Sequence, residues 1–90
     1  MRESNPRRDK IEIVADILEK ARRGAKKTNI MYGCNLSFTQ TEEYLQALSG
    51  LLELAPDGQY RATPEGINAS KIAEEAIRTF SEVYKKLREK

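Results

Sequence analysis

The sequence contains no histidine, no tryptophan and a single cysteine, Cys34. Zinc sites built from cysteine and histidine, disulfide frameworks and catalytic arrangements that need an imidazole are therefore excluded. Uninterrupted apolar runs reach only three or four residues, so we expect neither a membrane span nor the apolar stretch of a signal peptide. These absences predict an intracellular protein that is not an enzyme and that holds no metal and no cofactor.

Charge is abundant and unevenly placed. The 90-residue chain carries 16 Lys and Arg against 14 Asp and Glu, a net charge of +2. Residues 1–27 hold nine basic and five acidic side chains, residues 28–60 hold four acidic and no basic ones, and residues 61–90 hold seven basic and five acidic ones. Basic clusters at residues 7–8, 22–27 and 85–88 would attract phosphate if the fold brought them to one face. The alternative is that these side chains simply solvate helix surfaces.

Two helices are predicted before residue 34. The first begins at Asn5 and Pro6, an N-cap followed by proline at the first helical position, and ends at Gly24. Its apolar residues recur at helical spacing, at Ile11, Val14, Ala15, Leu18 and Ala21. A second helix of about two turns fits between Lys26 and Gly33.

A third helix and a hairpin follow. The helix begins after Ser37, because Gln40 three residues later completes a capping box, and it ends before Gly50. Its apolar side is predicted to hold Phe38, Thr41, Leu45 and Leu48. Residues 51–54 and 60–62 read as short extended segments, joined by a turn that contains proline and an Asp-Gly pair.

The last helix is predicted to be long. Thr63 and Pro64 repeat the cap-and-proline signal, and no strong helix breaker follows before Lys90. A helix of about 25 residues spans roughly 37 Å, which is longer than the body it would pack on. Its apolar residues follow the spacing of a coiled-coil seam, and the predicted dimer interface comprises Ala73, Ala76, Ile77, Phe80, Val83, Tyr84 and Leu87. The alternative is a helix that folds back onto its own domain.

The order of three helices, a hairpin and a long helix is that of a winged helix-turn-helix domain. We therefore predict a mainly α fold with a small β-hairpin wing, a winged helix-turn-helix domain over residues 5–66 and a long C-terminal dimerisation helix over residues 63–90. The chain also resembles the small archaeal winged-helix proteins typified by the dimeric nucleoid-associated proteins of Sulfolobus. The resemblance rests on residues 13–18 (IVADIL), 25–32 (AKKTNIMY), 35–38 (NLSF), 44–45 (YL), 60–61 (YR) and 63–66 (TPEG).

The resemblance implies a DNA-binding surface with three parts. The start of the second helix would meet a phosphate strand, the third helix would enter the major groove, and the hairpin would reach a phosphate or the minor groove. The candidate DNA-binding residues in these parts are Lys26, Lys27 and Thr28; Thr39, Gln40, Glu43 and Gln46; and Gln59 and Arg61. The sequence departs from the family pattern because its third helix carries Glu42 and Glu43 where lysines are common.

These observations favour a homodimeric protein that binds double-stranded DNA and acts as a transcription regulator or a nucleoid-associated protein. The resemblance implies that the partner helices run antiparallel and that the protein works in the cytoplasm, on the nucleoid. The alternative is a winged helix that binds another protein and has lost DNA binding, which the acidic third helix motivates. A continuous basic strip through the second helix, the wing and the amino terminus would favour DNA, and a broken strip would favour the alternative.

Overall fold

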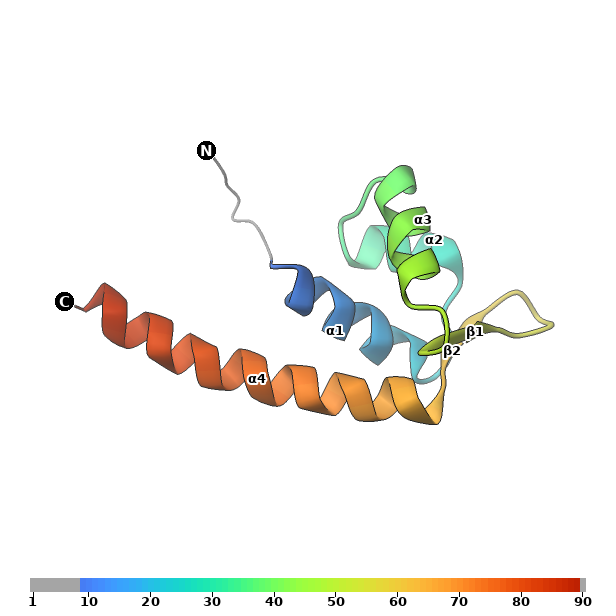
Figure 1. Cartoon of the computed structure of the whole chain (residues 1–90). Coiled ribbons are helices and arrows are strands. Elements are labelled where there is room, and N and C mark those ends of the chain that lie inside the picture. Colours follow the sequence, from blue (N-terminus) through green and yellow to red (C-terminus); the bar gives the residue numbers. More distant parts are fainter. Residues whose placement is uncertain (1–8, 90) are drawn as a thin grey trace.

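The structure is a computed structural model that describes residues 9–89. Over these residues the chain forms a mostly helical fold with one antiparallel hairpin and a long last helix (Figure 1). The elements are α1 (Lys10–Ala21), α2 (Lys27–Gly33), α3 (Phe38–Ala47), β1 (Leu52–Leu54), β2 (Tyr60–Ala62) and α4 (Pro64–Arg88). The predicted element order and fold class are confirmed.

The start of α1 differs from the prediction. The helix begins at Lys10, after Asp9, whose backbone is extended at φ −67° and ψ 155°. A helix that includes Asp9 is therefore ruled out, and the start was predicted too early. The predicted cap Asn5 and the basic pair at residues 7–8 lie outside the described residues. The predicted end is right, because Gly24 follows the helix with a positive φ of 96°.

The caps of α3 and α4 confirm their sequence signals. The backbone N–H of Gln40 donates to the Ser37 hydroxyl at 3.0 Å, and the backbone N–H of Ser37 donates to the Gln40 side chain at 2.9 Å. Thr63 accepts from the backbone N–H of Gly66 at 3.1 Å and donates to the carbonyl of Gly50 at 2.9 Å. Each cap satisfies donors that a helix start leaves without intrahelical partners, and Thr63 also ties α4 to the turn after α3.

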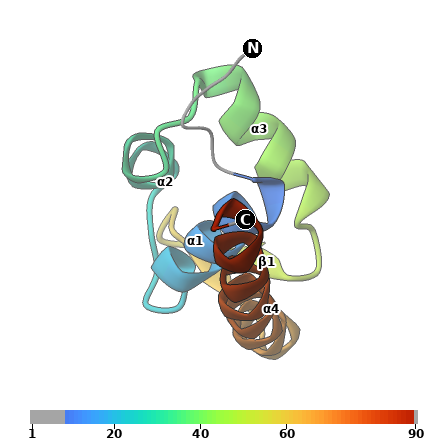
Figure 2. The same ribbon diagram turned by 90° about the vertical axis from the view of Figure 1, so that its left-hand side faces the viewer.

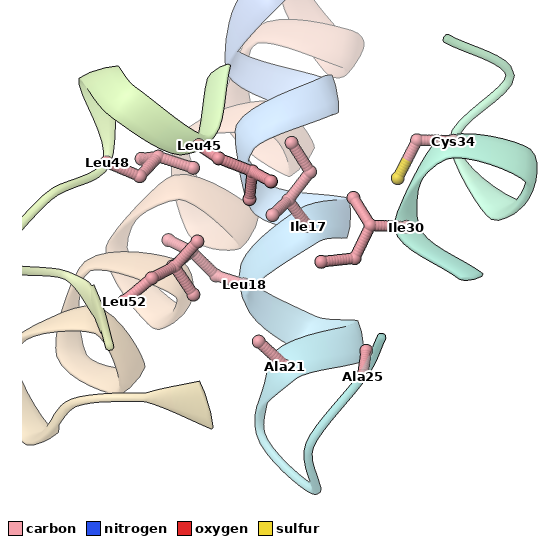
Figure 3. Packing of buried hydrophobic residues seen from close by; sticks show 9 residues of the cluster. All are labelled: Ile17, Leu18, Ala21, Ala25, Ile30, Cys34, Leu45, Leu48 and Leu52. Carbon is pink, nitrogen blue, oxygen red and sulfur yellow. The ribbon is translucent and has the colours of Figure 1, made fainter. Parts of the chain in front are cut away.

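The core surrounds α1 (Figure 3). Ile17 and Leu18 of α1 are fully buried, and they lie between α2 on one side and α3 with β1 on the other (Figure 3). The buried apolar cluster comprises Ile17, Leu18, Ala21, Ala25, Ile30, Cys34, Leu45, Leu48 and Leu52. The predicted core position Phe38 is an exception, because its side chain is 62% exposed. Thr41, in the same turn of α3, is fully buried, so the exposure concerns the Phe38 side chain and not the whole turn.

The hairpin forms the predicted wing. Leu52, Glu53 and Leu54 pair with Ala62, Arg61 and Tyr60 in antiparallel register. Tyr60 also exchanges two backbone hydrogen bonds with Ala25, at 3.0 and 2.8 Å, so the segment between α1 and α2 lies along the second edge of β2. This bridge fixes the wing relative to the start of α2.

The first turn of α4 packs closely on the chain before the wing. A Cβ atom placed on Gly66 would lie 2.1 Å from the carbonyl oxygen of Leu51. That oxygen also accepts a hydrogen bond from the backbone N–H of Thr63 at 3.0 Å. Glycine is required at this position because the backbone of α4 touches the neighbouring carbonyl directly.

The outer half of α4 extends beyond the body. α4 packs against α1 on the side opposite α2 and α3 (Figures 1 and 2). The molecule measures 52 × 28 × 18 Å, and its radius of gyration of 14.3 Å exceeds the value of about 12 Å expected for a compact chain of this length. The prediction that the long helix overhangs its domain is confirmed.

Candidate nucleic-acid interface

The outer side of α3 is polar and exposed. Thr39, Gln40, Glu43 and Gln46 are all exposed, whereas Thr41 and Leu45 of the same helix are buried. The capping box holds the Gln40 amide, because its oxygen accepts from the backbone N–H of Ser37. The structure therefore gathers the four predicted groove residues on one accessible surface, with the orientation of Gln40 set by the helix cap.

A lysine from another helix lies beside this surface. A shallow hollow of about 320 Å³ is lined by Lys10 of α1 and by Gln40, Glu43, Tyr44 and Ala47 of α3. Lys10 brings a basic side chain to the same hollow as Glu43, whereas the sequence of α3 contains no basic residue. Sequence analysis missed Lys10 because only the packing of α1 on α3 places it there.

The start of α2 presents two different lysines. Lys26 is the exposed N-cap residue, and Thr28 in the first turn is also exposed. Lys27 is only half-exposed, because its ammonium forms an ion pair with the carboxylate of Glu42 on α3. The same ammonium lies 4.5 Å from the centroid of the Phe38 ring. The two lysines that the sequence grouped together thus have different environments.

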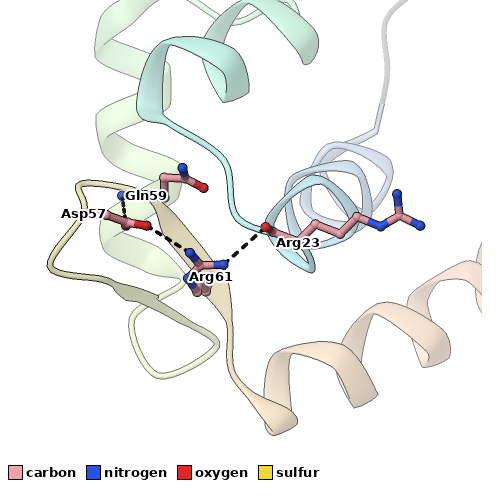
Figure 4. Close-up of polar contacts among 4 residues, drawn as sticks. All are labelled: Arg23, Asp57, Gln59 and Arg61. Atoms are coloured by element: carbon pink, nitrogen blue, oxygen red, sulfur yellow. Dashed lines mark hydrogen bonds and ion pairs between the residues drawn. The ribbon is translucent and has the colours of Figure 1, made fainter.

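Arg61 of the wing is held by two partners (Figure 4). Its guanidinium donates to the Asp57 carboxylate at 3.0 Å and to the backbone carbonyl of Arg23 at 3.2 Å. The other carboxylate oxygen of Asp57 accepts from the backbone N–H of Gln59 at 3.0 Å. The Gln59 N–H and the Arg61 guanidinium lower the pKa of Asp57 below its usual value of 3.8. Arg61 therefore ties the wing to the segment between α1 and α2.

Gly24 allows that contact. A Cβ atom at Gly24 would lie 2.4 Å from the Gln59 amide oxygen and 2.7 Å from the Arg61 guanidinium. Arg23 directly precedes Gly24 in the chain. Its guanidinium points away from Arg61 and toward solvent (Figure 4). The wing and the start of α2 consequently meet at a point where Arg23 and Lys26 supply exposed positive charge.

The basic strip is broken within the described residues. Carboxylates hold two of the predicted phosphate contacts, Lys27 and Arg61, whereas Lys26 has no carboxylate within ion-pair distance among residues 9–89. Lys10, which sequence analysis did not select, lines a hollow beside α3, and Arg23, a member of the predicted basic cluster at residues 22–27, is exposed next to the wing. The surface therefore combines an uncharged to acidic α3 with separate cations around it.

The predicted seam of α4 divides into two parts. Its first members, Ala73, Ala76 and Ile77, are half-buried. Its outer members are exposed, and these are Phe80, Val83, Tyr84 and Leu87. The rings of Phe80 and Tyr84 stack with centroids 6.5 Å apart, and both side chains line a groove of about 180 Å³ beside Ile11 of α1. An apolar surface thus continues from α1 onto the overhanging end of α4.

Residues 9–89 contain neither a cluster of metal-binding side chains nor a membrane-spanning helix. Nowhere in this range do three or more Cys, Asp or Glu side chains gather in a way that could hold a metal ion. No helix in the same range is long and apolar enough to cross a membrane.

Comparison with known proteins identifies the family. A family model described as winged helix-turn-helix matches residues 7–81. The chain belongs to the winged helix-turn-helix family. In this family's terms α2 and α3 form the helix-turn-helix, α3 is the recognition helix, and the hairpin is the wing.

A solved structure shares the fold. The fold is similar to that of Sso10a-2, a DNA-binding protein from Sulfolobus solfataricus, with a TM-score of 0.78 and 23% sequence identity. The match covers 91% of this chain and 92% of that protein, so the long last helix belongs to the shared fold. The predicted resemblance to the small winged-helix proteins of Sulfolobus is confirmed. A search of curated proteins found no significant match.

Proposed function

We propose that this winged-helix protein binds double-stranded DNA as a homodimer, as a transcription regulator or a nucleoid-associated protein in the cytoplasm. The observation that carries the proposal is the exposed polar side of α3, the recognition helix of the fold, with the start of α2 and the wing next to it. The protein acts by binding and not by catalysis, in keeping with a family defined by helix-turn-helix architecture.

The proposed contacts separate into phosphate contacts and base contacts. Lys26 and Thr28 at the start of α2 bind phosphate oxygens on one strand. Side chains of α3 face base edges in the major groove, where Gln40 and Gln46 suit adenine and Glu43 accepts from the amino group of cytosine. Thr39 contacts either a base or a phosphate. Gln59 at the wing provides a further contact on the adjacent backbone.

The proposed dimer uses the outer half of α4. Phe80, Val83, Tyr84 and Leu87 are large apolar side chains that the described residues leave open to water. Covering them with the same stripe of a second copy stabilises association by roughly 25 cal/mol for each Å² of apolar surface removed from water. A two-fold dimer also doubles the number of DNA contacts, and it presents the two recognition helices to two half-sites.

A matched pair of lysine variants tests the DNA surface. Lys26→Ala removes an exposed cation at the start of α2, and Lys71→Ala removes an exposed cation from α4. Both lower the net charge equally, but only the first lies in the proposed interface. We expect Lys26→Ala to weaken duplex binding at least threefold at low salt and Lys71→Ala to leave it nearly unchanged, as measured by fluorescence anisotropy. Equal effects of the two variants would contradict the proposed docking.

A second candidate function is the binding of another protein through α3. The broken basic strip favours it, because Glu42 and Asp57 hold Lys27 and Arg61. Phosphate contacts supply most of the sequence-independent affinity for DNA. Neutralised cations at this surface are therefore what we expect of a chain that has lost DNA binding. Absence of saturable duplex binding at low salt would favour this second function.

A further inference from the structure

One cation links α2 and α3 at the edge of the candidate interface. Lys27 is the first residue of α2, and its ammonium pairs with the Glu42 carboxylate on α3. The ring of Phe38 lies 4.5 Å from the same ammonium, measured to the ring centroid. Phe38 and Glu42 are one helical turn apart, so both reach the cation from the same face of α3.

This arrangement changes what Lys27 offers to DNA. Its position at the start of α2 suits a phosphate contact, but the recognition helix already supplies the ammonium with an anion. A phosphate must either displace the Glu42 carboxylate or approach a Lys27 ammonium whose charge that carboxylate already neutralises. The Lys27 and Glu42 side chains are 32% and 44% exposed, so water and phosphate both reach the pair. An ion pair of this kind exchanges partners readily.

Arg61 is paired in a different way. It bonds the Asp57 carboxylate within the wing and the backbone carbonyl of Arg23 outside it. The backbone contact makes Arg61 part of the join between two segments, and its release would loosen that join. The ion-pair and ring contacts of the Lys27 ammonium are both with side chains of α3, so a phosphate that replaces Glu42 leaves the backbone in place.

We propose that Glu42 is an affinity-setting residue that competes with DNA phosphate for the Lys27 ammonium, and so limits sequence-independent binding by the recognition helix. The proposal rests on the proposed DNA-binding function and names the regulation of the same surface. Glu42 acts through Lys27 and is not itself a base-reading group, unlike its neighbour Glu43, which lies on the exposed side of α3.

The variant Glu42→Gln isolates the charge. Glutamine keeps the length and hydrogen-bonding capacity of the side chain and removes its negative charge. Release of Lys27 adds one phosphate contact for each protomer, which steepens the slope of log K against log salt by about 0.9 for each contact. The added contact means an extra loss of affinity of about threefold to fourfold for each protomer between 50 and 200 mM salt. At low salt the variant binds duplex DNA several-fold more tightly than the wild type.

A double-mutant cycle shows whether the effect passes through Lys27. The cycle compares wild type, Glu42→Gln, Lys27→Gln and the double variant in the same salt titration, with thermal unfolding recorded to confirm that each is folded. The proposal predicts that Glu42→Gln steepens the salt slope in the wild type and leaves it unchanged when residue 27 is glutamine. The matched comparison is Glu43→Gln, which removes a neighbouring charge and shows no coupling to Lys27.

The outcomes separate this proposal from the proposed function. Wild-type binding with equal salt slopes for wild type and Glu42→Gln overturns the role of Glu42 and leaves DNA binding intact. An effect of Glu42→Gln that persists without Lys27 also overturns it, because general charge repulsion then explains the gain. No duplex binding by any of the four proteins overturns the proposed function itself.

Discussion

At the scale of single residues, the close approach between α4 and Leu51 means that alanine at Gly66 lowers the stability of the fold, which is the opposite of its usual effect in a helix. Alanine at a helical glycine normally stabilises a helix, by up to about 1 kcal/mol. At Gly66 the added Cβ would lie 2.1 Å from the Leu51 carbonyl oxygen and 3.0 Å from the carbonyl carbon, both of them backbone atoms. The backbone must shift to make room for a methyl group.

We predict that Gly66→Ala destabilises the fold by about 1 to 3 kcal/mol, the usual range for overpacking. The control is Gly33→Ala at the end of α2, where the added Cβ would meet only the flexible end of the Lys20 side chain. Urea denaturation measures both free energies of unfolding. Stability of Gly66→Ala equal to or above that of the control would contradict the close packing.

Single residues also show which contacts could be predicted from the sequence. Capping signals are local, so Ser37 with Gln40 and Thr63 with Pro64 predicted two helix starts correctly. The ion pair of Lys27 with Glu42 and the bond from Arg61 to the Arg23 carbonyl join different elements, and no local pattern announces them. Sequence reasoning missed Lys10 for the same reason, because only packing between two helices places it at the interface.

At the scale of elements, helical periodicity predicted which faces are apolar but not how far they are covered. Leu45 and Leu48 are buried as predicted, whereas Phe38 on the same side of α3 is exposed. The Phe38 ring is instead contacted by the ammonium of Lys27 at the start of α2. The start of α1 was misplaced because the signal at residues 5–6 resembles a cap, whereas Asp9 is the residue that precedes the helix.

The outer half of α4 leads to a prediction at the same scale. Phe80→Asp places a charge in the middle of the exposed apolar stripe and should convert a dimer into a monomer at micromolar concentration. The control is Arg78→Asp, because residue 78 lies on the opposite side of α4 and gains the same side chain. Light scattering gives the mass. We expect twice the 10.3 kDa chain mass for wild type and Arg78→Asp, and the single mass for Phe80→Asp.

Two results would contradict the dimer. The first is a wild-type protein of single mass, and the second is a Phe80→Asp variant that keeps the double mass. Circular dichroism of the variant shows whether α4 remains helical, so that loss of the dimer is not confused with loss of the helix. The control variant tests whether an aspartate anywhere on α4 has the same effect.

At the scale of the whole molecule, the net charge of +2 says little, because the charges are separated in space. The acidic segment forms α3 and the wing, and the basic residues Lys10, Arg23 and Lys26 lie around it. The sequence showed this separation along the chain. Only the fold shows that carboxylates neutralise Lys27 and Arg61, so that the basic strip around the recognition helix is broken.

The salt dependence of duplex binding by the wild-type protein tests the central claim most directly. If Lys26 of each protomer meets a phosphate, a dimer makes two cationic contacts and the slope of log K against log salt is about −2. Fluorescence anisotropy with a short duplex should then show saturable binding at 50 mM salt and a loss of about tenfold by 200 mM. No saturable binding at 50 mM, or affinity that does not change with salt, would contradict the account.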